Sequence, residues 1–120
     1  MTVDYDRPAE RQSAAAAKLL QLEADWEGAK LLMMQAAWMA DNRKPNSLEA
    51  SMAKAKAGRV GNDITLRCVE LTGTLGYSET ELLEKWARDS KILDIFEGTQ
   101  QIQQLIVARR LLGLSSAQLR

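Results

Sequence analysis

The amino-acid sequence predicts an all-α protein, an up-and-down bundle of three long helices and one short helix. Apolar residues recur at alternating intervals of three and four, and no useful length of chain alternates between apolar and polar residues. Residues typical of helix ends also stand where the periodic stretches begin and end, notably Ser47, Ser78 and Gly113. Together these observations favour packed helices over a sheet.

The first long helix is expected from Ser13 to about Asp41, after an irregular polar lead-in over residues 1–12. One apolar face is formed by Leu19, Leu22, Trp26, Ala29, Met33, Ala36 and Ala40. The Met and Trp stripe of the same helix is interpreted as core or interface rather than as a cofactor site; it contains Trp26, Met33, Met34, Trp38 and Met39. Pro45 then predicts a turn over residues 42–46, because proline cannot continue a helix.

The second long helix is expected from an N-cap at Ser47 to about Leu71. Its apolar face contains Ala53, Ala57, Val60, Ile64, Cys68 and Leu71, so Cys68 is interpreted as a small core residue. Gly58 and Gly61 lie inside this helix, where each glycine costs roughly 1 kcal/mol relative to alanine. Such a cost indicates either close packing, with another segment or a ligand, or a simple kink.

The short helix is expected to follow the break at Gly73–Tyr77, with a cap at Ser78 and an end near Arg88. Its inward side chains would be Leu82, Leu83 and Trp86.

The last long helix is expected from about Thr99 to Leu112, where Gly113 suits the position after a helix. The bundle domain would therefore span residues 13–113, and residues 114–120 would form a C-terminal tail.

Composition excludes several classes of function. The 120 residues suffice for one domain, and sixteen basic and sixteen acidic residues cancel, so nucleic acid is not an expected partner. The sequence has no His and a single Cys68, which argues against a metal site and excludes an internal disulfide. No run approaches the roughly 20 apolar residues of a membrane span, and no secretory leader is visible. We therefore expect a cytoplasmic protein without membrane insertion.

One acidic residue, Glu97, stands between an apolar pair and a Gly-Thr step. Ile95 and Phe96 would shield its carboxylate from water, which raises a carboxyl pKa towards the range useful to a general base. Gly98 removes side-chain bulk, so a flat ligand could approach, and Thr99 would cap the following helix. The alternative is that Glu97 merely gives favourable charge near a helix start.

Two segments carry a resemblance to a known family. Residues 95–103, Ile-Phe-Glu-Gly-Thr-Gln-Gln-Ile-Gln, with Leu105–Arg110, resemble the catalytic segment of the flavin-dependent acyl-CoA dehydrogenases. Residues 69–77 are similar to the family's Gln-x-x-Gly-Gly-x-Gly-Tyr turn, with Glu70 where Gln is usual and Thr74 where Gly is usual. The likeness covers about residues 20–113, the family's C-terminal helical domain.

The resemblance implies a function for each segment. Glu97 would remove the α-proton of an acyl-CoA thioester bound beside Gly98, and FAD would accept the β-hydrogen as hydride. Thr99 and Gln101 would contact FAD, and the turn containing Glu70, Gly73 and Thr74 would contact the FAD of a neighbouring subunit. A carboxylate at position 70 would repel a pyrophosphate.

The resemblance also implies an enzyme of fatty acid degradation that assembles as a homo- or hetero-oligomer, a dimer or tetramer, through its helical domains. The family's N-terminal helical domain and middle β-domain are not in this sequence, so the 120 residues alone are expected to be inactive. A second reading keeps the fold without the chemistry: a non-catalytic helical assembly module. Flavin absorbance would separate the two.

Overall fold

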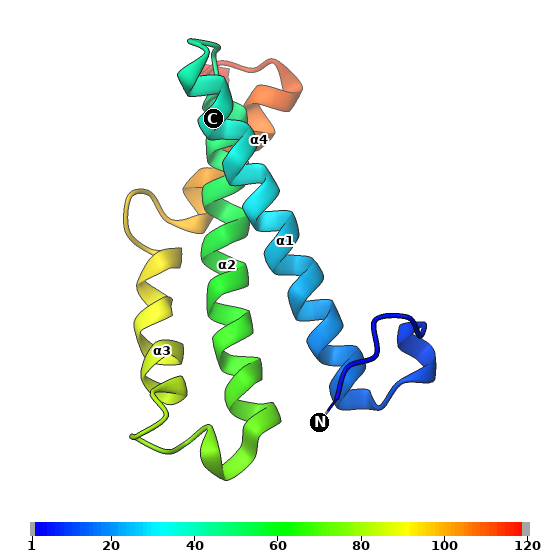
Figure 1. Ribbon diagram of the computed structural model, residues 1–120. Coiled ribbons are helices and arrows are strands. Elements are labelled where there is room, and N and C mark those ends of the chain that lie inside the picture. The colour runs from blue at the N-terminus through cyan, green and yellow to red at the C-terminus, as the bar shows by residue number, and fades with distance from the viewer. Residues whose placement is uncertain (1, 119–120) are drawn as a thin grey trace.

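The computed structural model describes residues 2–118, and over that range the chain is helical without any strand (Figure 1). The α-helices are α1 (Ala14–Asp41), α2 (Ser47–Thr72), α3 (Leu83–Asp89) and α4 (Gln100–Leu112). Short 3-10 turns are η1 (Ala9–Arg11), η2 (Gly73–Leu75), η3 (Ser90–Asp94) and η4 (Ser116–Gln118). The predicted all-α bundle is confirmed. Residues 119 and 120 of the predicted tail lie outside the described residues.

Helix α2 is the centre of the structure. It contacts α1 along one side and α3, η3 and α4 elsewhere, as Figure 1 shows. Two polar links join α1 and α2: the Lys56 ammonium lies 2.9 Å from an Asp25 carboxylate oxygen, and the Asn46 side chain donates to the Ala36 carbonyl at 2.9 Å. Of the elements that follow α2, η2, α3, η3 and α4 all pack against it.

Most predicted helix ends agree with the structure. The Ser13 hydroxyl accepts a hydrogen bond from the Ala16 backbone N–H at 3.2 Å, which caps α1. Gly113 follows α4 with φ +67°, the left-handed conformation typical of glycine after a helix. The second cap is shifted by one residue, because Ser47 is already helical and Asn46 occupies the cap position without a side-chain hydrogen bond.

The prediction that Ser78 caps the short helix was wrong. Ser78 closes a separate turn, in which its carbonyl accepts from the Glu81 N–H and its hydroxyl from the Thr80 N–H, each at 3.3 Å. Helix α3 begins only at Leu83, and Leu82 precedes it with φ +61°. The polar turn competes with helix formation for the serine, as short polar side chains commonly do.

The buried core consists mainly of small residues: Ala16, Leu22, Ala29, Ala36, Ala53, Val60, Val69 and Ala87. Several expected core positions are exposed instead, because α1 and α3 each pack mainly against α2 and leave their other faces uncovered. Trp26 is 50% and Met33 is 53% exposed, and Ala57, Leu82 and Trp86 are exposed too. The radius of gyration is 17.5 Å, against about 14 Å for a compact domain of this length. Much apolar surface is thus left uncovered.

Candidate functional site

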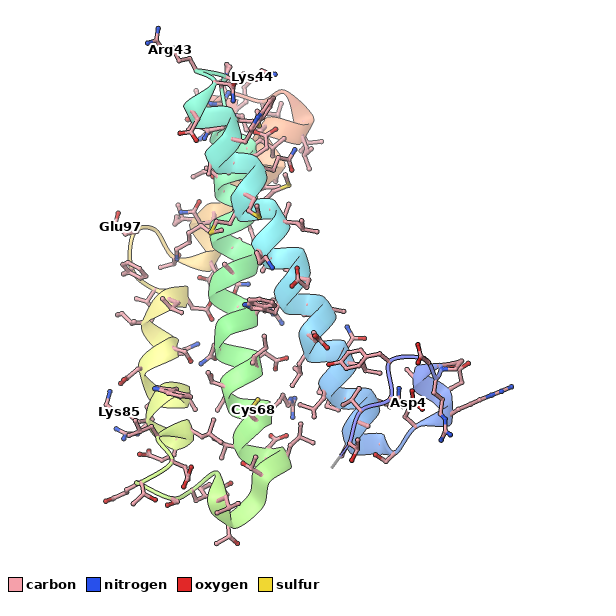
Figure 2. All side chains as sticks on the ribbon, viewed as in Figure 1. Asp4, Arg43, Lys44, Cys68, Lys85 and Glu97 are labelled. Carbon is pink, nitrogen blue, oxygen red and sulfur yellow. The ribbon has the colours of Figure 1, made fainter. Side chains whose placement is uncertain are left out.

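Glu97 lies in the connection from η3 to α4, at a sharp turn. Its φ is +55° and that of Gly98 is +90°, so two successive residues adopt left-handed backbone. Figure 2 shows Glu97 at the outer bend of this connection, pointing away from the bundle. A non-glycine residue in this conformation costs roughly 1–2 kcal/mol, and such strain persists where the surrounding structure imposes it.

One anchor of the turn is Lys54 of α2. Its ammonium donates to the Leu93 carbonyl at 2.8 Å and to the Gly98 carbonyl at 2.9 Å. It also lies 5.6 Å from the centre of the Phe96 ring, within reach of a cation–π interaction. The chain from Leu93 to Gly98 therefore bends around one positive charge.

The second anchor comes from the start of α4. The Gln103 amide donates to the Glu97 carbonyl at 3.1 Å, so the main chain of Glu97 itself is held. The Thr99 hydroxyl accepts from the Ile102 N–H at 3.4 Å, which confirms the predicted cap. Glycine suits position 98 because its φ is +90°, a conformation that residues with a side chain rarely adopt.

A face of α2 provides the third anchor. A β-carbon on Gly58 would lie 2.7 Å from the Leu93 carbonyl oxygen, so only glycine permits this approach. Further along, the Asn62 amide donates to the Ser90 hydroxyl at 3.1 Å, and Thr65 shares a hydrogen bond with Ser90 at 2.9 Å. The cost of glycine inside α2 is thus explained at Gly58 by close packing.

Ile95 and Phe96 do not shield the Glu97 carboxylate from water in this structure, contrary to expectation. Ile95 is 51% and Phe96 is 47% exposed, and Glu97 is exposed as well. The reason is the bend itself, which turns the side chains of residues 95–97 outward. The backbone carbonyls of the bend point inward: those of Leu93 and Gly98 accept from Lys54, and that of Glu97 accepts from Gln103. Within the described chain, Glu97 is anchored through its backbone and its side chain remains open to solvent.

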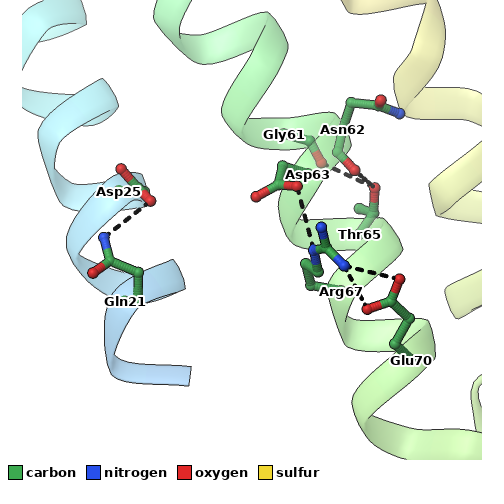
Figure 3. A network of polar contacts seen from close by, with 8 residues as sticks. All are labelled: Gln21, Asp25, Gly61, Asn62, Asp63, Thr65, Arg67 and Glu70. Atoms are coloured by element: carbon green, nitrogen blue, oxygen red, sulfur yellow. Dashed lines mark hydrogen bonds and ion pairs between the residues drawn. The ribbon is translucent and has the colours of Figure 1, made fainter. Parts of the chain in front are cut away.

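The second expected cofactor-binding segment lies at the C-terminal end of α2. Gly73 has φ +58° and open space where a β-carbon would be, and Thr74 is exposed. Glu70 does not stand as a bare charge: Arg67 contacts its two carboxylate oxygens at 3.0 and 2.8 Å (Figure 3). This hydrogen bond to Glu70 is the main cause of the raised pKa of Arg67. An Asp63 carboxylate oxygen also lies 3.6 Å from the Arg67 guanidinium.

The two groups of candidate residues are far apart. Sixteen positions of α2 separate Lys54, beside the Glu97 turn, from Glu70, which is about 24 Å along a helix. Thr99 and Gln101 lie with Glu97 at the start of α4, whereas Glu70, Gly73 and Thr74 lie at the other end of α2. They form two sites rather than one.

Two other features bear on function. An open apolar groove of about 550 Å³ runs between α1 and α2, and its lining includes Trp26, Met33, Ala57 and Val60. Half-burial raises the pKa of the Cys68 thiol, which favours the unreactive protonated form and supports its structural interpretation.

Among residues 2–118, no cluster of acidic or Cys side chains could hold a metal ion. None of the helices in that range is both long and apolar enough to span a bilayer.

Sequence reasoning did not assign the anchoring residues Lys54 and Gln103 a role at the site. Lys54 contacts carbonyls 39 and 44 residues away, a relationship that no local spacing encodes. Gln103 does stand four residues after the Thr99 cap, and a polar side chain at that place can turn back over the helix start. That spacing is the signal that could have indicated it.

The fold and the site define a helical domain that presents one anchored acidic turn and leaves a broad apolar surface open. The family described as "Acyl-CoA dehydrogenase, C-terminal domain" matches residues 2–112. The chain therefore belongs to the acyl-CoA dehydrogenase family, and it corresponds to the C-terminal helical domain.

Named relatives agree with this assignment. The chain is 37% identical over 108 residues to the mitochondrial short-chain specific acyl-CoA dehydrogenase of Bos taurus, covering 90% of this chain and 26% of that protein. It is 37% identical to the caffeyl-CoA reductase-Etf complex subunit CarC of Acetobacterium woodii, covering 82% and 26%. The structure of butyryl-CoA dehydrogenase from Megasphaera elsdenii aligns with a TM-score of 0.81 and 30% identity, covering 93% and 29%. The chain thus spans about a quarter of the length of these curated relatives.

Proposed function

We propose that this chain is the base-bearing domain of an enzyme that removes hydrogen from the α and β carbons of an acyl-CoA thioester. Glu97 is the base that takes the α-proton. The observation that carries the proposal is the turn itself: Glu97 adopts left-handed backbone, and Lys54 and Gln103 hold the carbonyls around it. A positioned carboxylate on a fixed main chain is what general-base catalysis requires.

The residues around Glu97 support this role. Gly98 adds no side chain of its own next to Glu97, and the Gln103 amide lies 2.7 Å from where its β-carbon would be, so a thioester approaches the carboxylate from its solvent-exposed side. Ile95 and Phe96 offer an apolar surface that is half open in this chain. When an acyl chain covers that surface, water is excluded from the neighbourhood of Glu97, and the base acts in a less polar environment.

The donor set fits FAD at both candidate sites. Thr99 uses its hydroxyl oxygen as an acceptor for the Ile102 N–H, which leaves the hydroxyl proton to donate, and the Gln101 amide is exposed two residues further on. At the other end of α2, Gly73 leaves room for a close approach, Thr74 adds a hydroxyl, and Arg67 offsets the charge of Glu70. When bound, FAD supplies the acceptor for the β-hydrogen. These residues would bind and orient it.

The domain also serves assembly in this proposal. Trp26, Met33, Met34 and Trp38 are all about half exposed on α1. A surface of this kind usually meets a partner. We assign it to contacts within a homo- or hetero-oligomer, a dimer or tetramer, of a cytoplasmic enzyme of fatty acid degradation. The 120 residues alone are inactive, because they lack the parts that would complete the sites.

The test is Glu97→Gln in the complete flavoprotein, followed by anaerobic stopped-flow reduction of the flavin by acyl-CoA. Glutamine keeps the size and removes the proton acceptor, so flavin stays bound while its reduction slows by roughly 10²- to 10⁴-fold. The control is Glu79→Gln, an exposed acid in the turn before α3, which stays within about twofold of the parent. Reduction at the parent rate in Glu97→Gln would place the base elsewhere.

A second candidate is a non-catalytic assembly module of an acyl-CoA dehydrogenase-like complex. The observation that favours it is the exposure of Glu97 together with the wide apolar surface of α1. The purified complete protein separates the two candidates. An enzyme is yellow and its flavin bleaches with acyl-CoA, whereas an assembly module is colourless and oligomeric.

A further inference from the structure

We infer that Lys54 is a positioning residue for Glu97: its ammonium fixes the turn from which the base projects. This inference rests on the proposed function of Glu97. Lys54 is not a catalytic residue in this account, because its hydrogen bonds go to main-chain carbonyls and not to a reacting group.

The geometry joins the two ends of the turn. Leu93 lies in η3 and Gly98 directly follows Glu97, and one ammonium bonds both carbonyls, at 2.8 and 2.9 Å. Six residues, 93 to 98, are thereby closed into a loop around a single charge. Hydrogen bonds from an ionised donor are roughly twice as strong as neutral ones, so this closure resists opening.

The electrostatics favour a cation at this place. The Leu93 carbonyl belongs to the C-terminal end of η3, where backbone carbonyls carry partial negative charge. The Phe96 ring presents its face 5.6 Å away, and aromatic faces attract ammonium groups. A lysine has three donors on one nitrogen, so two carbonyls can share it without competition.

The lysine also holds the turn to a rigid element. Its own backbone lies in the middle of α2, one helical turn before Gly58, which contacts the Leu93 backbone directly. Lys54 thus holds the turn at a second point on α2, in addition to the direct contact between Gly58 and Leu93. Without the ammonium, the strained backbone at Glu97 loses a constraint and can relax towards other conformations.

The experiment compares Lys54→Met with Lys56→Met in the complete flavoprotein. Methionine keeps the length and removes all donors. Lys56, on the same helix as Lys54, makes only a partly exposed ion pair with Asp25 of α1. A misplacement of about 1 Å in a catalytic group can cost up to about 100-fold in rate. In Lys54→Met we expect flavin reduction at saturating acyl-CoA to slow by about 10- to 100-fold, with the acyl-CoA dissociation constant within about threefold of the parent.

Three further measurements give readouts besides activity. Hydrogen exchange of residues 93–100 should accelerate in Lys54→Met and stay at the parent level in Lys56→Met. Lys54→Arg, which retains donors for both carbonyls, should recover most of the rate. In the Glu97→Gln background, Lys54→Met should slow reduction no further, because the lysine acts through the base.

The outcomes separate this inference from the proposed function. If Glu97→Gln does not slow flavin reduction, the proposed function fails and this inference fails with it. If Glu97→Gln slows reduction but flavin-loaded Lys54→Met reduces at the parent rate, only the role of Lys54 is overturned. A variant that loses thermal stability while its exchange at residues 93–100 and its rate are unchanged has the same consequence.

Discussion

Gly58 faces the backbone of Leu93 so closely that a β-carbon on it would lie 2.7 Å from the carbonyl oxygen and 3.1 Å from the carbonyl carbon. Real side chains essentially never approach a backbone atom at the shorter distance. The contact explains why a glycine stands in the middle of a long helix. It also means that, at Gly58, the backbone of the segment leading to Glu97 lies directly against the backbone of α2.

The first prediction uses the neighbouring glycine as the matched control. Gly58→Ala and Gly61→Ala each gain up to about 1 kcal/mol of helix propensity. At Gly61 the new β-carbon would meet only the Leu93 side chain, at an ordinary 3.4 Å. We expect Gly58→Ala to be less stable than Gly61→Ala by about 1–3 kcal/mol in urea unfolding followed by circular dichroism, because it must push the backbone away. Equal stabilities would contradict the contact.

The second prediction concerns backbone strain at Glu97, whose φ is +55°. Glu97→Ala and Glu97→Gly both remove the carboxylate, but only glycine adopts this backbone without steric cost. We expect the glycine variant to be more stable by about 1 kcal/mol, although glycine is usually the less stable choice elsewhere. Thermal unfolding of the two variants would check it, and a more stable alanine variant would argue against a left-handed residue.

The third prediction concerns pH. The pKa of Asp25 is lowered, first by the hydrogen bond from Lys56 and then by that from Gln21. Figure 3 shows the hydrogen bond between Gln21 and Asp25. A lowered folded pKa stabilises the folded state above the unfolded pKa, near 4, and this contribution is lost as pH falls through the folded value. Carbon-13 NMR titration should find the Asp25 pKa below that of an ordinary aspartate, and Lys56→Met should move it back upward. An unchanged pKa in the variant would exclude the ion pair as its cause.

The fourth prediction concerns assembly. Met34 is 53% exposed on α1, within an apolar surface that should meet a partner subunit. We expect light scattering of the complete protein to give a dimer or tetramer, and Met34→Glu to shift it towards smaller species because a charge is then buried at the contact. Gln35→Glu adds the same charge at the neighbouring polar position and should leave the assembly intact. A parent that is monomeric at tens of micromolar would count against the interface.

Much of the fold could be predicted from local signals. Helix ends depend on local backbone chemistry, and the structure has three of them as predicted: the caps at Ser13 and Thr99, and Gly113 after α4. The start of α3 could not be predicted this way, because Ser78 forms its own turn and Leu82 adopts a left-handed backbone that leucine does not favour locally. Likewise, which apolar residues are buried depends on how many helices cover α1.

The candidate site divides in the same way. The special residues of the turn, Glu97 and Gly98, stand out in the sequence, and their roles remain predictions. The positive φ of Glu97 and the reach of Lys54 to Gly98 follow from tertiary contacts across dozens of residues. A strained residue at a functional turn is where local preference is expected to fail, since the surrounding fold overrides it.

The alanine-rich seam between α1 and α2 has a consequence for how these helices are aligned. The side chains of Ala29, Ala36 and Ala53 are small, so they let the two helices approach closely, and the larger buried residues here are Leu22 and Val60. Two polar pins add to the alignment: Asp25–Lys56 in the middle part of both helices, and Asn46 to the Ala36 carbonyl beside the turn that joins them. A slide of α1 by one helical turn, about 5.4 Å, would break both pins and bring Met33 or Asp25 to the place of Ala29. The two hydrogen-bonded contacts and the small side chains of the seam thus specify the same position of α1 along α2.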